Sequence, residues 1–303
     1  MHWKKLGLVY CVNKESSWMH SHAAVPFAEN IKDDLFRIYF TTRDAYNRSH
    51  TSYLTIDICK PTEIIEVSDK PVISPGRLGS FDDSGAMGSW VINHDGKKFL
   101  HYIGWNLGGT VPFRNSIGLA ESKDGGLTFE RVFEGPILDR TKEEPQFCSN
   151  SCVIVEDGLW RMWYISCVNW FERDGQIMHR YHIKYATSLD GIEWNRDGIV
   201  SIDFDSSDEY AISRPSVLKE GDIYRMWYSF RGESYRIGYA ESTDGVHWSR
   251  KDSEVGIDVS AEGWDSEMIE YPYVFKHKDT LYMLYNGNDY GKTGFGLAVL
   301  SEQ

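Results

Sequence analysis

One repeated strand pattern constrains the fold of this chain more than any other feature of its sequence. Its clearest copy spans residues 223–248, where an aromatic strand pattern at 224–228 is followed by a Gly-containing break, a second alternating strand and an Asp244-Gly245 turn. Alternating β-branched and aromatic residues are typical of strands, and Asp-Gly between two such runs indicates a hairpin. The segment is therefore predicted to form one antiparallel meander.

Copies of this meander fill the chain. Five aromatic strands recur with a period of roughly 60 residues, at 36–40, 99–102, 160–164, 224–228 and 281–285. Four short strands per copy without a helical pattern are typical of a β-propeller, because no copy could bury both faces of its small sheet alone. We predict that residues 1–303 form a single all-β domain, a five-bladed β-propeller with four antiparallel strands per blade.

The two ends of the chain are predicted to share one sheet. Residues 3–12 read as a strand with no copy of their own, whereas the last copy, ending at 294–300, lacks its final strand. An open propeller would leave unpaired strand edges. The N-terminal strand is therefore expected to join the fifth blade and close the ring.

Charge and composition exclude several classes of function. The net charge of −13 disfavours binding to nucleic acid or to anionic membranes. The sequence shows neither a signal-peptide pattern nor an 18-residue apolar run, so a cytoplasmic protein without a membrane partner is expected. Five cysteines without CxxC spacing indicate reduced thiols.

The segments that lead into the first strand of each copy are the most informative for function. In a propeller these first strands line the central channel, and the segments before them surround one mouth. Aligning the five copies predicts five channel positions: His22, Gly88, Asn150, Arg214 and Tyr271. Acidic residues precede four of the five first strands. Such residues also favour turns, so a structural role remains open for each.

The repeated aromatic strands and the Ser-x-Asp-Gly-x-x-Trp units at 188–194 and 242–248 resemble the five-bladed propeller superfamily of carbohydrate-active enzymes. That superfamily includes arabinanases and β-xylosidases, invertases and levansucrases, and mannoside phosphorylases. The resemblance implies a funnel-shaped active site with carboxylates from different blades, lying about 5 Å apart for retention or about 6.5–9.5 Å apart for inversion. The chain departs from the hydrolases at its first inner strand, because residues 18–23 contain no Asp.

A second resemblance concerns residues 122–129, which fit the Asp box of sialidases. In sialidases this motif is a structural turn far from the catalytic centre. Sialidases have six blades, an arginine triad and a Tyr nucleophile. Five copies and no opening Arg motif make a sialidase the weaker interpretation.

Glycosyl transfer requires one protonated and one ionised carboxyl group. We predict Asp83 and Glu270 as catalytic residues, followed by Glu209 and Glu144. Arginine binds carboxylate or phosphate through two parallel hydrogen bonds, so an anionic substrate or attacking phosphate is a hypothesis. The predicted substrate-binding residues are His22, Arg43, Asp44, Asn150, Arg214, Arg231, Glu267 and Tyr271.

The remaining candidates concern metals and sugar stacking. His20, His22 and His50 do not have metal-ligand spacing, so neither a metal site nor a cofactor is expected. Trp105 and Trp170 are two of four tryptophans that could stack on sugar faces or pack between sheets.

Together these features predict a glycoside hydrolase-like enzyme that acts on a small glycoside or oligosaccharide in a funnel at the channel mouth. Two alternatives remain open. One is an inverting glycoside phosphorylase or another sugar-modifying enzyme of polysaccharide metabolism, and the other is a non-catalytic propeller that binds a glycan or a protein.

Overall fold

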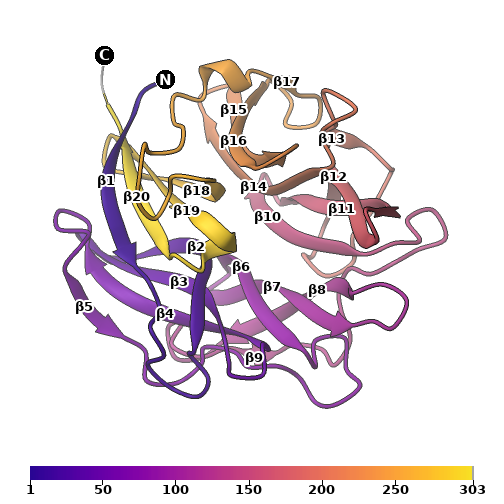
Figure 1. Ribbon diagram of the computed structural model, residues 1–303, viewed down its shortest axis with the longest axis horizontal. Coiled ribbons are helices and arrows are strands. Elements are labelled where there is room, and N and C mark those ends of the chain that lie inside the picture. Colours follow the sequence, from indigo (N-terminus) through magenta and orange to yellow (C-terminus); the bar gives the residue numbers. More distant parts are fainter. Residues whose placement is uncertain (302–303) are drawn as a thin grey trace.

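The computed structural model describes residues 1–301, which fold almost entirely into β-strands (Figure 1). The strands follow one another in antiparallel groups. The first two groups are β2 (Ser21–Lys32), β3 (Leu35–Arg43), β4 (Ser49–Asp57) and β5 (Ile64–Val67), then β6 (Gly85–His94), β7 (Lys97–Leu107), β8 (Phe113–Ser122) and β9 (Glu130–Arg131). The next two are β10 (Cys148–Glu156), β11 (Leu159–Arg173), β12 (Gln176–Ser188) and β13 (Val200–Ile202), then β14 (Ala211–Glu220), β15 (Ile223–Arg231), β16 (Tyr235–Ser242) and β17 (Ser249–Arg250).

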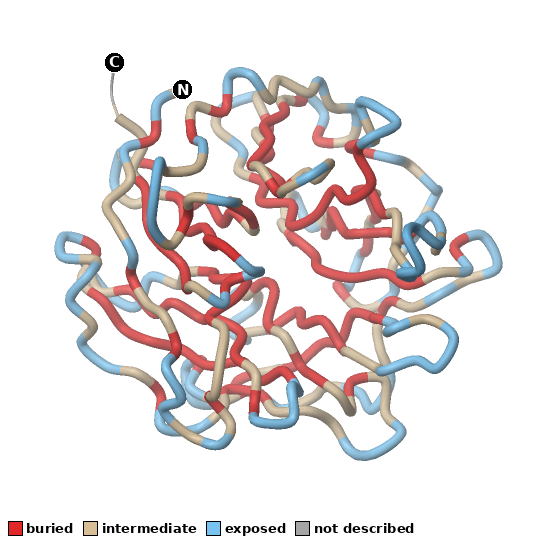
Figure 2. The backbone as a smooth tube through the Cα atoms, viewed as in Figure 1, coloured by how far each residue is buried: buried red, intermediate tan, exposed pale blue. Residues whose placement is uncertain are grey.

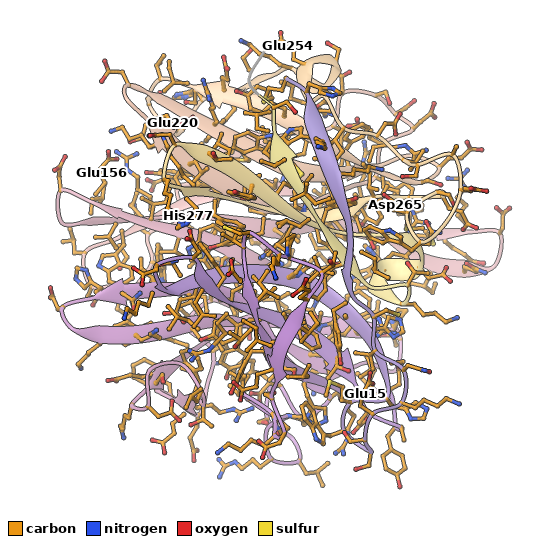
Figure 3. The ribbon with its side chains drawn as sticks, turned by 90° about the vertical axis from the view of Figure 1, so that its left-hand side faces the viewer. Glu15, Glu156, Glu220, Glu254, Asp265 and His277 are labelled. Atoms are coloured by element: carbon orange, nitrogen blue, oxygen red, sulfur yellow. The ribbon has the colours of Figure 1, made fainter. Side chains whose placement is uncertain are left out.

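The last group combines both ends of the chain. It consists of β18 (Glu270–His277), β19 (Thr280–Asn286), β20 (Phe295–Leu300) and β1 (Trp3–Tyr10), and β1 pairs antiparallel with β20. Figure 3 shows β1 beside the yellow strands of this group. Lys5 of β1 also forms an ion pair with the buried Asp265 at 2.7 Å. Two short helices complete the structure, a 3-10 helix η1 (Asp252–Glu254) and α1 (Asn288–Gly291).

The groups are arranged around a common centre. Their first strands, β2, β6, β10, β14 and β18, lie innermost in Figure 1. Each first strand contacts the first strand of the following group, and β18 contacts β2. Single parallel bridges, Ser49 to Gly85 and Tyr181 to Ala211, join the first group to the second and the third to the fourth. The chain is therefore organised as sheets that surround an axis, with the buried segments along the strands and the exposed ones largely at the turns (Figure 2).

Each predicted aromatic strand is the second strand of its group and supplies the core between groups. Trp163 and Trp227 are fully buried. The indole of Trp163 donates a hydrogen bond to the Gly245 carbonyl oxygen in the next group, at 2.9 Å, and Trp227 packs edge-on against Trp3. Burying each large aromatic side chain contributes roughly 2–3 kcal/mol. These contacts hold neighbouring groups together.

The Ser-x-Asp-Gly-x-x-Trp units are structural turns, as predicted. In the second unit, the Ser242 hydroxyl oxygen accepts a hydrogen bond from the Gly245 N–H at 2.9 Å. Asp244 Oδ1 accepts bonds from the N–H groups of Val246 and His247, each at 2.8 Å. Gly245 has a φ of 74°, a left-handed conformation that glycine adopts at little cost.

None of the helices within residues 1–301 is both long and apolar enough to cross a lipid bilayer.

Candidate functional site

The innermost strands carry a recurring backbone distortion at the predicted channel positions. His22, Asn150, Arg214 and Tyr271 have positive φ angles of 63°, 26°, 53° and 55°. The hydrogen-bond register of each strand shifts at or next to these residues. Such a conformation costs a non-glycine residue on the order of 1 kcal/mol, and strained residues of this kind cluster at functional sites.

Glycine occupies the corresponding position of the second group for a steric reason. A Cβ atom on Gly88 would lie 2.9 Å from the Phe27 ring. The register of β6 also shifts between Gly88 and Trp90. All five predicted channel positions therefore lie where the first strand leaves regular pairing.

A pocket of about 280 Å³ is lined by residues of all five groups. The second and third groups contribute its apolar half. There Trp105, Phe113, Phe147, His179 and Tyr181 form what we call the aromatic wall. Phe113 lies 4.3 Å from Trp105 and 5.4 Å from Phe147 between ring centroids, and His179 stacks on Tyr181 at 4.8 Å. The rings of Trp105, Phe113 and Phe147 are tilted by 48–54° from one to the next, so the wall is a cluster of separate ring faces, any one of which suits the apolar face of a sugar ring.

The other half of the pocket is cationic. Arg43 ends β3 and Arg231 ends β15, and Tyr271 of the intervening fifth group also lines the pocket. The Arg231 guanidinium lies 5.3–5.7 Å from the ring centroids of Tyr210, Tyr235 and Tyr290, and it donates a hydrogen bond to the Tyr290 hydroxyl. Its position is therefore fixed by aromatic rings.

Arg214 lies in the floor of the pocket and is fully buried. It donates hydrogen bonds to the carbonyl oxygens of Ser89 at 2.6 Å and Pro26 at 3.1 Å, and to Asn150 Oδ1 at 3.4 Å. Burial lowers its pKa to about 10, which leaves it charged at neutral pH. Arg214 thus ties the inner strands of four groups together and places a positive charge beneath the pocket.

Glu270 is fully buried next to Tyr271, and neither of its carboxyl oxygens has a hydrogen-bond partner within residues 1–301. Burial raises its pKa well above 4.5, although the charge of Arg231 opposes this shift. The hydroxyls of Tyr181 and Tyr235, which line the pocket beside it, lie 2.5 Å apart. Burial therefore favours the protonated, uncharged form of Glu270, whose neighbour Tyr271 lines the pocket.

The histidines add no positive charge near the pocket. Burial and the charge of Arg43 lower the pKa of His22 to about 4. Burial and the charge of Arg231 lower the pKa of His179 to about 4. Both imidazoles are neutral at pH 7, so the positive potential comes from the arginines.

The structure brings together part of the predicted site. Arg43, Asn150, Arg214, Arg231 and Tyr271 all line the pocket, with Glu270 behind them. The other predicted residues lie elsewhere. Asp44 is buried within its own loop, where it pairs with Arg48 at 2.9 Å, and Glu267 is exposed. His22 is half-buried and its Nδ1 lies 2.9 Å from the Ser21 hydroxyl.

Two predicted catalytic carboxylates, Glu144 and Glu209, lie in the segments before β10 and β14 and form ion pairs with outer strands of the same groups. Glu144 accepts hydrogen bonds from the Tyr164 hydroxyl at 3.0 Å and from Lys184 at 3.2 Å. Glu209 is bound by both terminal nitrogens of Arg250, at 2.8 and 2.9 Å. Neither residue lines the central pocket. These ion pairs and hydrogen bonds favour a structural role for Glu144 and Glu209 over a catalytic one.

Asp83 also lies outside the central pocket. Its Oδ2 accepts a hydrogen bond from the Gly79 N–H at 3.0 Å, and its Oδ1 accepts bonds from the Ser84 hydroxyl at 2.9 Å and the Asn106 amide at 3.1 Å. These contacts organise the turn before β6. The catalytic role predicted for Asp83 would therefore have to be exercised outside the central pocket.

Sequence reasoning missed most of the aromatic wall and the tyrosines near Glu270. The missed residues lie at or near strand ends that the pairing registers bring to the same side of the sheets: Phe113, Phe147, His179, Tyr181 and Tyr235. They could have been found by taking each predicted hairpin turn and following its two strands to the ends opposite the turn. Within residues 1–301, no group of three His, Cys, Asp or Glu residues is placed to hold a metal ion.

The sequence of the chain is similar to those of several known proteins. No family model matches its sequence. The uncharacterized protein of Mycobacterium tuberculosis, named MT1551 in one strain and Rv1502 in another, is 43% identical over 300 residues, which cover 99% of both chains. The chain belongs to the Rv1502 family. The Rv1502-like chain also matches a 1,2-β-oligomannan phosphorylase of a Thermoanaerobacter species, with 28% identity over 137 residues and 44% of each chain.

Solved structures show what fold this Rv1502-like chain has. A thermostable family-43 glycoside hydrolase superposes with a TM-score of 0.72 and 16% identity, covering 95% of this chain and 93% of the other. An endo-arabinase of Bacteroides thetaiotaomicron gives 0.66 and 13%, covering 98% of both chains. Another glycoside hydrolase gives 0.77 and 19%, covering 99% of this chain and 92% of the other. The chain therefore has the β-propeller fold seen in these glycoside hydrolases, as the sequence resemblance predicted.

Proposed function

We propose that this protein is a carbohydrate-active enzyme that acts on a glycoside or oligosaccharide in the central pocket. In this proposal the five strand groups are the blades of one propeller, and pairing of β1 with β20 closes the ring. The fold is common to several activities, so the argument for function rests on the pocket itself.

Unpaired polar atoms at the pocket carry the proposal. Five lining residues have a buried hydrogen-bonding atom without a partner within residues 1–301: Trp105 Nε1, Asn115 Oδ1, Ser213 Oγ, Arg214 Nε and Arg231 Nε. Buried polar groups are normally satisfied, because leaving one unpaired costs about 1–3 kcal/mol. Such donors and acceptors in and around an aromatic wall match the hydroxyl groups and the apolar face of a sugar.

Glu270 is the proposed general acid. Burial raises its pKa and so favours the protonated carboxyl group, which is the form that can donate a proton to a leaving-group oxygen. Glu270 does not line the pocket, and within residues 1–301 no hydrogen bond joins its carboxyl group to the hydroxyls of Tyr181 and Tyr235. The proposal therefore requires the Glu270 carboxyl group to turn toward one of these hydroxyls, which would donate its own proton to the leaving group and take the carboxyl proton in return.

One observation favours the phosphorylase alternative over simple hydrolysis. Two-carboxylate hydrolysis needs a second acidic residue as base or nucleophile. Glu144, Glu209 and Asp83, the other predicted carboxylates, do not line the pocket. In an inverting phosphorolysis the attacking oxygen belongs to phosphate, so a single carboxylic acid suffices to assist the leaving group.

The experiment is a screen of aryl glycosides and short oligosaccharides with the purified protein, with and without inorganic phosphate. Cleavage of one sugar class is expected, and Glu270→Gln should lower kcat/KM by at least about 100-fold. The matched control is Glu134→Gln, which alters an exposed carboxylate outside the pocket. Sugar binding with no turnover under any condition would instead support the non-catalytic alternative, and equal activity of the two variants would remove Glu270 from the mechanism.

A further inference from the structure

The three arginines of the central pocket share one unusual property. Within residues 1–301, neither Arg43, Arg214 nor Arg231 forms an ion pair, although many other basic residues of this acidic chain do. Arg250, for example, binds two carboxylates. A charge taken partly or wholly out of water is costly unless it is compensated. The pocket therefore concentrates positive charge that the protein leaves without an internal counter-ion.

The acidic groups near the pocket do not supply that counter-ion. Within residues 1–301 neither carboxyl oxygen of Glu270 is hydrogen-bonded to an arginine, and burial raises its pKa and disfavours its charged form. Asp289 is exposed and its carboxylate faces Lys292 at 3.9 Å. With neutral histidines as well, the local charge is set by the arginines in a protein of net charge −13. Low-dielectric walls around such charges focus the field on whatever enters the pocket.

The two arginines nearest the solvent have donors available. Both are half-buried at the ends of their strands. Arg231 uses one terminal nitrogen to bind the Tyr290 hydroxyl, and Arg43 uses one to bind the Asn47 side-chain oxygen at 3.2 Å. A guanidinium carries five N–H donors in a planar fork that matches carboxylate and phosphate oxygens. Each arginine can therefore bind an oxyanion without giving up a protein ion pair.

We infer that the ligand of this pocket is an anionic carbohydrate, whose phosphate or carboxylate group is bound by Arg43 and Arg231 while its sugar ring lies on the aromatic wall. This inference rests on the proposed function and adds the class of substrate. Arg214 strengthens the binding through its charge from beneath the floor. Tyr290 occupies one donor of Arg231, and the remaining donors are available to the oxyanion.

The test measures binding of four probes by calorimetry in low salt: glucose, glucose 6-phosphate, glucuronate and inorganic phosphate. At least one anionic sugar is expected to bind about 10-fold or more tightly than glucose, and the difference should shrink as NaCl is raised. Arg231→Gln and Arg43→Gln should each weaken that binding by about 10-fold or more, since each removes a charge-assisted hydrogen bond to the oxyanion. Arg77→Gln, which alters an exposed arginine paired with Glu134, should change it less than twofold.

The outcomes show whether the bound oxyanion belongs to the sugar or is free phosphate. They also distinguish a failure of this inference from a failure of the proposed function. If an anionic sugar binds more tightly than both glucose and inorganic phosphate, the oxyanion belongs to the substrate, as inferred. Phosphate binding that matches the anionic sugars and is lost in Arg231→Gln would assign the site to free phosphate and overturn the substrate class. If neutral glycosides bind or react and no anion does, this inference fails while the proposed function stands. If phosphate binds and no sugar binds or reacts, the proposed function fails with it.

Discussion

Arg250 and Glu209 form a two-pronged ion pair in which both terminal guanidinium nitrogens contact the carboxylate, at 2.8 and 2.9 Å. The pair joins the segment that precedes β14 to the last strand of the same group, β17. Asp82 and Arg131 make the equivalent contact in the second group at 2.6 Å, and Lys5 and Asp265 make it in the last group. In each of these three groups, an ion pair therefore joins the outermost strand to the segment that precedes the innermost strand.

Glu209→Gln is accordingly expected to lower the free energy of unfolding by about 2 kcal/mol, because it removes one of the two carboxylates that bind the largely buried Arg250 guanidinium and leaves only Asp252. Urea denaturation measures the loss, and Glu134→Gln in an exposed pair should cost less than about 0.5 kcal/mol. Turnover per folded molecule should stay unchanged. A variant of normal stability that has lost its activity would restore the catalytic role for Glu209.

Glu270→Gln is expected to change how stability depends on pH. The folded pKa of Glu270 lies well above its unfolded value, so the native state binds more protons than the unfolded state between the two pKa values. Wild-type stability should therefore fall as pH rises above about 4.5, by up to about 1.4 kcal/mol per pH unit, until the folded pKa is reached. The variant lacks this loss, so the difference between their unfolding free energies should grow from pH 5 to pH 7. Parallel curves would show that Glu270 is ionised in the folded protein.

His101 is expected to change the pH dependence of stability in the opposite direction, by lowering stability as the pH falls. It is fully buried, neither ring nitrogen has a partner within residues 1–301, and burial lowers its pKa to about 3. The unfolded state then binds more protons below about pH 6.5, so stability is lost as pH falls toward the folded pKa. His101→Leu should lose less stability than the wild type between pH 7 and pH 5. His2→Gln, at an exposed position, serves as control, and an unchanged pH profile in His101→Leu would contradict the assignment.

Asp124→Ala tests the turn at residues 122–129. The Asp124 carboxylate accepts hydrogen bonds from the Leu127 and Thr128 N–H groups and from the Thr128 hydroxyl, at 2.6–3.0 Å. Losing these charge-assisted bonds should cost about 1–2 kcal/mol of unfolding free energy. Ligand affinity should not change, because the turn does not line the pocket. A fall in affinity without a fall in melting temperature would assign the turn to the site, and Glu143→Ala provides an exposed control.

The sequence predicted the strands and the inner-strand positions because both depend on short-range patterns. Aromatic alternation at 160–164 and 224–228 identifies second strands, and aligning the copies identified Asn150, Arg214 and Tyr271 as pocket residues. The roles of the acids depend instead on distant partners. Nothing near Glu209 in the sequence indicates that Arg250, 41 residues later, will neutralise it. Glu270 is also buried, but within residues 1–301 no basic side chain forms a hydrogen bond with its carboxyl oxygens.

Pairing of β1 with β20 has a consequence for how the protein forms during synthesis. Trp3 of β1 pairs with Leu300 of β20, so β1 cannot gain this partner until nearly 300 further residues have been synthesised. The four internal groups use partners close in sequence and can form earlier, whereas such a long-range contact is slow to form. A nascent chain that stops before β20 therefore exposes unpaired edges on both β1 and β19, which are sites for aggregation or for a chaperone.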